Sequence, residues 1–352
     1  MSHSTARALG ALILGTVLAA PLAAFAQAAA APAATPPAAP AQAAPSAPPT
    51  PAKDSTAVPG WNKPPVWGGV SESPQYASIP GRETNVLIQG QGREWRAFHN
   101  GPLTVYGGWI IGLAFLAVVA FFLVKGPIKV KEPATGRMIE RFNAVERASH
   151  WTMAISFVLL ALTGAMILWG KYLVLPWMGY AAFSWLTILG KNIHNFVGPL
   201  FIFSLAVMFL LFVKDNLYRA GDMAWFFSFG HGASGRFNGG EKLWFWGGIV
   251  VLGAVMAATG LILDFPNWNQ TRELMQEVNV IHAMAAVAFI SLAFFHVYLG
   301  TIGVEGAYRA MREGYVDENW AKEHHSLWYQ EVKDGKRSER VIPAGTQPAT
   351  GD

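Results

Sequence analysis

The chain has 352 residues, of which 52% are hydrophobic and only 14% are charged, and its formal net charge is +4. A soluble protein is about 25% charged, so this composition predicts a membrane protein. There is no cysteine, which excludes disulfides, thiolate-held zinc, cysteine-held iron–sulfur clusters and covalently attached c-type haem. The lysines and arginines lie beside apolar segments and not in one patch, so nucleic acid is not an expected partner.

The N-terminal region has the pattern of an exported protein. Residues 1–26 contain Arg7, a short apolar stretch and an Ala24-Phe25-Ala26 ending, which together predict a cleaved signal peptide. An uncleaved anchor is the alternative, but the apolar stretch is short for a span. Residues 27–59 are almost entirely alanine and proline and predict a disordered linker. Residues 60–102 follow as a mixed segment that we expect on the exported, periplasmic side.

Uncharged runs of membrane length come next. A helix needs about 20 residues to cross the hydrocarbon layer, and five runs reach that length: 103–124, 148–170, 192–213, 243–263 and 278–304. The sequence therefore predicts an all-α membrane protein with five transmembrane helices. Asn143 and Glu146 have the spacing of a capping box, so the helix that contains the second run is expected to begin near residue 144.

A sixth uncharged stretch, 172–190, contains Pro176 and Gly179 and is ambiguous. The distribution of basic residues resolves it. If this stretch does not cross the membrane, one side contains segments 125–147, 214–242 and 305–340, which carry six, four and seven Lys/Arg. The other side then contains loops 171–191 and 264–277, which carry two and one. Cytoplasmic loops are the basic ones. The mature N-terminus is then exported, the C-terminus is cytoplasmic, and 172–190 lies along the outer interface.

Four of the nine histidines lie in the predicted spans, where ionisable residues are costly and mark functional sites: His150, His194, His282 and His296. His282 and His296 are fourteen residues apart, which is about 21 Å along a helix and about 40° short of four full turns, so both face the same side. His194 and His282 begin their helices on the outer side, whereas His150 begins its helix on the inner side. The predicted pairs are therefore His194 with His282 and His150 with His296.

Two facing pairs of imidazoles indicate two haems, because a haem iron takes neutral nitrogen ligands above and below its ring. With both axial positions filled, the remaining task is electron transfer. Small residues that would give a flat ring room are Gly164, Gly198 and Ala286. The alternatives are a proton or metal relay and plain packing. The predicted spans contain no Asp or Glu, which disfavours a carboxylate relay.

Several segments resemble the cytochrome b (gamma) subunit of membrane-bound formate dehydrogenase. The resemblance covers about residues 137–332 and rests on these stretches: Arg141 to Trp151, Asn192 to Pro199, Phe237 to Lys242, Ile281-His282-Ala283, Phe295 to Tyr298 and Trp320 to Tyr329. The di-haem cytochromes of nickel–iron hydrogenases and thiosulfate reductases share the same four-helix core and remain the alternative. Span 103–124 would then be an extra N-terminal helix, and 333–352 a cytoplasmic tail.

The resemblance implies a subunit of a respiratory oxidoreductase in the bacterial inner membrane. Catalytic (alpha) and iron–sulfur (beta) subunits would oxidise formate on the exported face, and this chain would hold no formate-oxidising site. Electrons would pass from the outer haem b of His194 and His282 to the inner haem b of His150 and His296. They would then reduce menaquinone or ubiquinone near the cytoplasm, beside Asn238 and Gly240. Independently of the family, Asn238 lies in a Gly-rich loop and suits a quinone carbonyl, although Asn-Gly is more often only a turn.

The remaining histidines have less specific predictions. His99 precedes the first span and is either an interfacial anchor or a docking residue for the iron–sulfur subunit. His231 lies in an inner loop, where it is either solvated or a proton donor to quinone. His324 and His325 have no carboxylate or cysteine framework that would predict a metal site.

Overall fold

The computed structural model describes residues 90–346 apart from positions 220, 229–231 and 269. The predicted signal peptide and linker, most of the predicted exported segment, and His231 lie outside the described residues. Within the described part, five helices are long and apolar enough to cross a membrane: Gly92–Lys125, Ala144–Leu173, Leu175–Phe212, Gly239–Asp264 and Arg272–Gly303. Each predicted span lies in a different one of them to within one residue, and the all-α membrane fold is confirmed.

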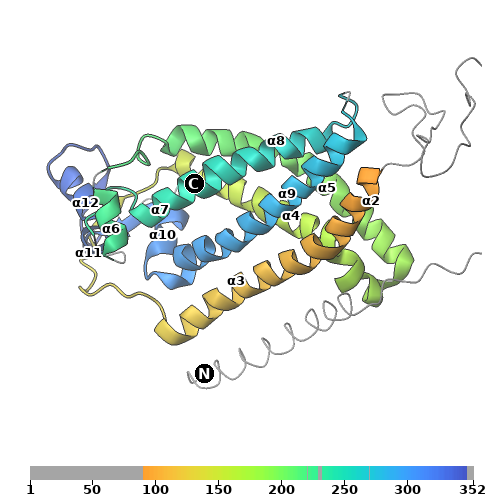
Figure 1. Ribbon diagram of the computed structural model, residues 1–352. Helices are drawn as coiled ribbons and strands as arrows, with labels where there is room; N and C mark the ends of the chain where they lie inside the picture. The colour runs from red at the N-terminus through yellow and green to blue at the C-terminus, as the bar shows by residue number, and fades with distance from the viewer. Residues whose placement is uncertain (1–89, 220, 229–231, 269, 347–352) are drawn as a thin grey trace, which may run out of the picture.

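Three of the long helices are composite. Their parts, with the two unbroken helices, are α2 (Gly90–Phe98), η1 (His99–Leu103) and α3 (Thr104–Lys125); α4 (Ala144–Leu173); α5 (Leu175–Phe212); α7 (Gly239–Leu243), η2 (Trp244–Leu252) and α8 (Gly253–Asp264); and α9 (Arg272–Tyr298) with η3 (Leu299–Gly303). The η segments are π-helical turns. Figure 1 shows the long helices side by side, with α4 packed along α5, α8 along α9, and α3 on the other side of α9.

The ambiguous stretch 172–190 forms no separate crossing. Helix α4 ends at Leu173, and α5 starts at Leu175 with a break at Gly179, whose φ of 72° is outside the helical region. From residue 180 the chain is helical again and runs back along the end of α4, where Gly170 faces Phe183 and Gly190 faces Met166. Most of the stretch is thus the beginning of the third span. Its position at the outer interface stays a prediction.

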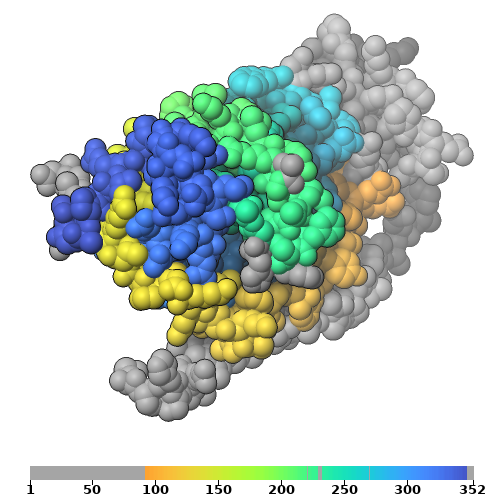
Figure 2. Space-filling model, turned by 90° about the vertical axis from the view of Figure 1, so that its left-hand side faces the viewer, coloured from red at the N-terminus to blue at the C-terminus, as the bar shows by residue number. Residues whose placement is uncertain are grey.

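Short elements gather at one end of the long helices. They are β1 (Met138–Glu140), α6 (Gly221–Phe227), α10 (Ala307–Arg312), β2 (Tyr315–Asp317), α11 (Glu318–His324), α12 (Ser326–Lys333) and β3 (Val341–Ile342). The strands form an antiparallel sheet in the order β2-β1-β3. We call these elements the cap. Figure 2 looks onto this end, where the C-terminal segment lies between the chain that precedes α4 and the chain around α6 and α7.

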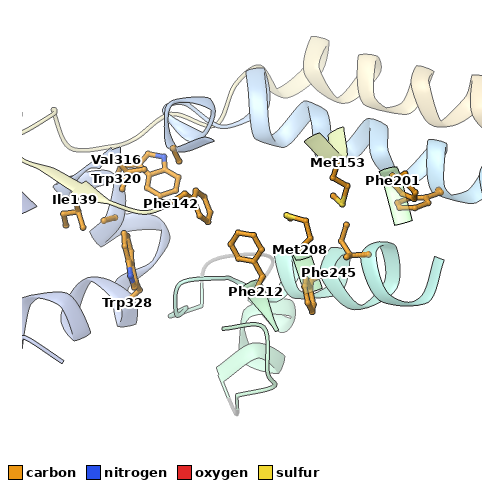
Figure 3. Packing of buried hydrophobic residues seen from close by; sticks show 14 residues of the cluster. Ile139, Phe142, Met153, Phe201, Met208, Phe212, Phe245, Val316, Trp320 and Trp328 are labelled. Carbon is orange, nitrogen blue, oxygen red and sulfur yellow. The ribbon is translucent and has the colours of Figure 1, made fainter. Parts of the chain in front are cut away.

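One buried cluster joins the cap to the long helices. Figure 3 shows it running from the cap, through the aromatic rings at the junction, to side chains of α4, α5 and η2. Its labelled members are Ile139, Val316, Trp320, Trp328, Phe142, Phe212, Met208, Met153, Phe245 and Phe201. A continuous apolar core of this kind holds the cap in a fixed position on the helices.

Buried ion pairs lie around the same junction. The Arg236 guanidinium bonds both carboxylate oxygens of Glu146, at 2.9 and 2.7 Å, and donates to Asp215 at 2.8 Å. Arg337 donates to the other oxygen of Asp215 at 2.6 Å. Burial alone would raise the pKa of Asp215, but the hydrogen bonds from Arg337 and Arg236 outweigh it and hold that pKa below its ordinary value. The ion pair between Arg337 and Asp215 therefore ties the C-terminal segment to the junction between the cap and the long helices.

Candidate haem-binding site

The four span histidines lie on three helices and meet in two pairs. His194 of α5 and His282 of α9 have ring centres 6.2 Å apart, and His150 of α4 and His296 of α9 are also separated by 6.2 Å. Helix α9 thus carries one member of each pair. A metal that bonds two imidazoles at roughly 2 Å each, with each ring centre roughly 1 Å behind its nitrogen, separates the ring centres by about 6 Å. The spacing of both pairs fits two axial ligands.

Threonine hydroxyls bond the outer pair. The Nδ1 atom of His194 lies 2.8 Å from Oγ1 of Thr163, and Nδ1 of His282 lies 2.8 Å from Oγ1 of Thr259. These contacts link α4 to α5 and α8 to α9. The two threonines were not among the predicted site residues. The available signal was a Thr-Gly pair in each of two uncharged spans.

The glycines near His194 have different surroundings. A Cβ on Gly164 would lie 3.3 Å from Cε1 of His194, so this glycine lets α4 approach the imidazole itself. A Cβ on Gly198 would meet no atom within 4 Å. Gly198 is one turn after His194, and the open space beside it suits a flat ring on that face of α5. Ala286 is half-buried one turn after His282.

The inner pair has a different environment. Nδ1 of His150 is buried and has no hydrogen-bond partner among the described residues. The His296 ring stacks on Trp244 of η2, with ring centres 4.7 Å apart and an angle of 12° between the planes. A buried imidazole without a partner is costly unless something supplies one. Among the described residues no protein group holds Nδ1 of His150, in contrast to the imidazoles of the outer pair.

A layer of phenylalanines separates the two pairs. Phe289 lies seven residues after His282 and seven before His296, and its ring contacts Phe157 at 4.9 Å and Phe201 at 6.4 Å. Phe157 and Phe201 each follow a histidine of their own helix by seven residues. Because seven residues are about two turns, each phenylalanine shares the face of its histidine. The pairs therefore lie at two levels with aromatic packing between them.

Comparison with known proteins shows the family to which this chain belongs. Residues 141–314 match the family described as prokaryotic cytochrome b561. The formate dehydrogenase cytochrome b556(fdo) subunit of Escherichia coli (strain K12) is 31% identical over 210 residues, which cover 55% of this chain and 93% of that protein. This chain belongs to the family of formate dehydrogenase cytochrome b subunits. Haem b is the cofactor that the family implies.

Two further relatives match a similar share of this chain. The nitrate-inducible cytochrome b556(Fdn) subunit of E. coli (strain K12) is 30% identical over 226 residues, covering 58% of this chain and 98% of that protein. The cytochrome b556 subunit of Haemophilus influenzae is 27% identical over 225 residues, covering 58% of this chain and 87% of that protein. Helices α2 and α3 lie before residues 141–314, which the family matches.

The predicted quinone residues of this cytochrome b lie at the start of α7. Asn238 is the N-cap: its Oδ1 accepts the backbone N–H of Glu241 at 3.0 Å, and the Glu241 carboxylate accepts the N–H of Asn238 at 2.9 Å. The side-chain carbonyl is thus used by the helix, and the amide NH₂ is the group left for a ligand carbonyl. Gly240 packs against Trp225: a Cβ on Gly240 would lie 2.9 Å from Cη2 of the Trp225 ring. Both residues are one or two turns before Trp244, which stacks on His296.

The other described histidines belong to neither pair. His99 lies in η1 with its ring 5.2 Å from that of Trp95. His325 is buried in the cap, where its Nδ1 lies 2.8 Å from the carbonyl of Gly235. Burial, reinforced by the Arg141 guanidinium, lowers the pKa of His325 to about 3, so this ring is neutral and donates its Nδ1 hydrogen to that carbonyl. His325 is therefore a packing residue of the cap, and the His324 ring lies 4.9 Å from that of Trp320.

Proposed function

We propose that this chain is the membrane cytochrome b subunit of a formate dehydrogenase, and that it carries electrons through two b-type haems to a quinone. The observation that carries the proposal is the meeting of four span histidines in two pairs, at two levels of one helix group, with 6.2 Å between the rings of each pair. When bound, the haems supply one-electron carriers at those two levels. Formate itself would be oxidised by partner subunits, as in the complexes that the relatives' names describe.

His194 and His282 would hold the outer haem, and His150 and His296 the inner one. The imidazoles would supply the nitrogen ligands of the iron. A haem held by two histidines in this way would carry electrons and would not bind oxygen or formate. The Phe157, Phe201 and Phe289 layer keeps the two levels apart.

The distribution of charge supports an orientation in the bacterial inner membrane. Arg141, Arg236, Arg337 and the other basic residues of the cap end lie at one end of the long helices, where they would face the cytoplasm. The opposite end, with α2 and the α4–α5 turn, would face the periplasm and the iron–sulfur (beta) subunit, with the catalytic (alpha) subunit beyond it. The mature N-terminus would be exported.

The quinone, menaquinone or ubiquinone, would bind at the cytoplasmic end beside the inner pair. Support comes from the position of Asn238 and Gly240 on the helix whose Trp244 stacks on His296. There the amide NH₂ of Asn238 would donate to a quinone carbonyl. Quinone would then be reduced at the end of the electron path away from formate oxidation.

Haem content tests the proposal. The purified protein is expected to show a reduced-minus-oxidised b-type spectrum with two haems per chain. The variant His282→Ala should lose the outer haem and retain the inner one, because only one pair contains this imidazole. The matched control is His99→Ala, which should retain both. A colourless wild-type protein, or His282→Ala with both haems, contradicts the proposal.

The partner needs its own experiment. The intact complex, purified through this chain in mild detergent, is expected to contain exported subunits that reduce a quinone analogue with formate. Reduction of the quinone analogue by hydrogen would instead assign the chain to the related hydrogenase cytochromes, and oxidation of a quinol coupled to reduction of thiosulfate would assign it to the thiosulfate reductase cytochromes.

A further inference from the structure

Two threonines make the same pair of hydrogen bonds on opposite sides of the outer histidines. Oγ1 of Thr163 lies 2.7 Å from the carbonyl oxygen of Leu159, one turn back on α4, and 2.8 Å from Nδ1 of His194. Oγ1 of Thr259 lies 2.6 Å from the carbonyl oxygen of Val255, one turn back on α8, and 2.8 Å from Nδ1 of His282. Each hydroxyl thus stands between a carbonyl of its own helix and an imidazole of the next helix.

Each threonine hydroxyl has a single hydrogen. The group that receives this hydrogen determines which nitrogen of the neighbouring imidazole is protonated. Two oxygens at 2.6 to 2.7 Å require a hydrogen between them, and the carbonyl has none, so each threonine donates to the carbonyl. The hydroxyl then has only lone pairs to offer Nδ1. Nδ1 must therefore be the protonated nitrogen, which donates to the threonine. In a neutral imidazole the lone pair for a metal is then on Nε2.

The glycine after each threonine lets the two helices approach. A Cβ on Gly164 would lie 3.3 Å from Cε1 of His194, and a Cβ on Gly260 would lie 3.6 Å from Cε1 of His282. The same Thr-Gly pair therefore bonds and contacts each ring of the outer pair. Two independent helices carry this arrangement, which makes it a repeated device and not one chance contact.

The inner pair lacks the arrangement. Nδ1 of His150 has no hydrogen-bond partner among the described residues, and His296 is instead stacked on Trp244. The two pairs have the same ring separation but different support for their ligands. Any effect of the threonine hydroxyls should therefore be confined to the outer level.

We propose that Thr163 and Thr259 are positioning residues for the outer haem: they hold His194 and His282 with Nε2 available to iron and increase the electron donation of both ligands. This inference rests on the proposed function, because it takes the outer pair as axial ligands. A hydroxyl that accepts the Nδ1 hydrogen makes the imidazole more basic. More basic axial ligands stabilise ferric over ferrous iron and lower the midpoint potential of that haem.

The test compares hydroxyl-free and hydroxyl-bearing variants in the haem-loaded protein. The variants are Thr163→Val and Thr259→Val, alone and combined, with Thr163→Ser and Thr259→Ser as rescues that keep the hydroxyl. Redox titration of the optical spectrum and the electron paramagnetic resonance g-values of each haem are measured. In the double valine variant we expect the ferrous-to-ferric ratio of the outer haem to rise about tenfold at a fixed potential, which is about 59 mV for a one-electron couple. The inner haem should not change.

The matched control is Thr152→Val. Thr152 lies on α4 and donates to the carbonyl of Ala148 at 2.8 Å, and it makes no hydrogen bond to an imidazole of the described residues. It should leave both potentials unchanged. Selective loss of the outer haem in the valine variants, with both haems kept in the serine variants, also supports the inference. Alanine at both positions serves as a second hydroxyl-free pair, because alanine favours helix and separates loss of the hydroxyl from faulty folding.

Two outcomes overturn different claims. If wild type binds two haems and the valine and alanine variants keep the wild-type potential and g-values at the outer haem, the positioning role is wrong and the proposed function stands. If wild type binds no haem, the proposed function itself fails, and this inference fails with it.

Discussion

Gly198 and Gly164 lie near the same histidine, but they have different roles in the structure. Gly164 is in contact distance of the His194 ring, so any side chain there would push against the imidazole. Gly198 borders space in which a Cβ would meet no atom within 4 Å. If the outer haem fills that space, a large side chain at Gly198 competes with the haem and not with the protein.

This difference makes a prediction. The variant Gly198→Leu should fold, because its side chain enters open space and leucine favours helix more than glycine does. It should nevertheless lose most of the outer haem and keep the inner one, as measured by the b-type spectrum per chain. The matched control is Gly112→Leu on α3, where a Cβ also meets nothing within 4 Å. Full haem content in Gly198→Leu would show that the ring does not occupy this face of α5.

The sequence predicted the histidine pairs but not the threonines, for a physical reason. Fourteen-residue spacing on one helix is fixed by helix geometry alone, so the shared face of His282 and His296 follows from the sequence. The threonine contacts depend on the register between neighbouring helices. Most threonines in such helices only bond back to their own carbonyls, as Thr152 does. The sequence does not reveal which of them also contacts an imidazole on the next helix.

At the scale of elements, the same capping rule operates twice. Asn143 and Glu146 were predicted to cap α4, and both hydrogen bonds of the capping box are present. Asn238 and Glu241 have the same spacing and cap α7 in the same way. Asn238 was predicted to contact quinone or to form a turn, and its role as a helix cap was not predicted. The helix start, not a ligand, is what fixes the Asn238 side chain in this structure.

Heptad spacing explains the layer between the histidine pairs. Phe157, Phe201 and Phe289 each follow a histidine by seven residues and so stand two turns further along the same faces. Their rings contact one another at 4.9 to 6.4 Å. The layer was predictable in principle, because the histidine positions already define the inward faces. Its closed packing was not, since ring contacts depend on rotamers and helix separation.

The buried ion pairs at the cap junction give a second prediction. In Arg236→Met, Glu146 loses its buried partner and Asp215 keeps only Arg337. Removing one member of a buried pair costs about 3–5 kcal/mol, so cap opening, measured by limited proteolysis in membranes, should become much faster.

Two comparisons check that explanation. The double variant Arg236→Met with Glu146→Gln should be less destabilised than Arg236→Met, because glutamine carries no charge and its side-chain oxygen can still accept the N–H of Asn143. Arg309→Ala removes an exposed pair with Glu313 and should change stability by about 0–1 kcal/mol. Equal proteolysis rates for Arg236→Met and Arg309→Ala would mean that the buried ion pairs of Arg236 do not keep the cap packed on the helices.

At the scale of the whole molecule, the membrane part was predictable and the cap was not. Long uncharged runs identify spans by composition alone. The strands of the cap are two or three residues long, so they show no alternating pattern and their segments were expected to be loops and a tail. β3 and Arg337, from the predicted tail, pair with β1 and Asp215. These long-range pairings exist only once the helices have brought distant segments together.

Helix α3 belongs to neither the family match nor the cap, and its packing leads to the last prediction. Gly107 of α3 lies close to both neighbouring helices: a Cβ there would be 3.1 Å from Cγ2 of Val287 and 3.5 Å from Cζ2 of Trp169. Gly107→Leu should therefore separate α3 from α4 and α9, because overpacking a tight contact costs about 1–3 kcal/mol. The four histidines lie on α4, α5 and α9, so both haems should be retained.

The natural chain has no cysteine. Two introduced cysteines therefore report on the contact between α3 and α9 without cross-links to other cysteines of the chain. Phe115→Cys and Phe294→Cys replace rings 5.6 Å apart across α3 and α9, and a short bifunctional thiol reagent should link them. Adding Gly107→Leu should reduce the yield of the cross-linked product several-fold, whereas adding Gly112→Leu should leave that yield unchanged. Unchanged cross-linking would mean that α3 is held to α9 by contacts elsewhere along its length. Loss of haem together with cross-linking would mean that α3 is required for haem binding, although the haem ligands all lie on other helices.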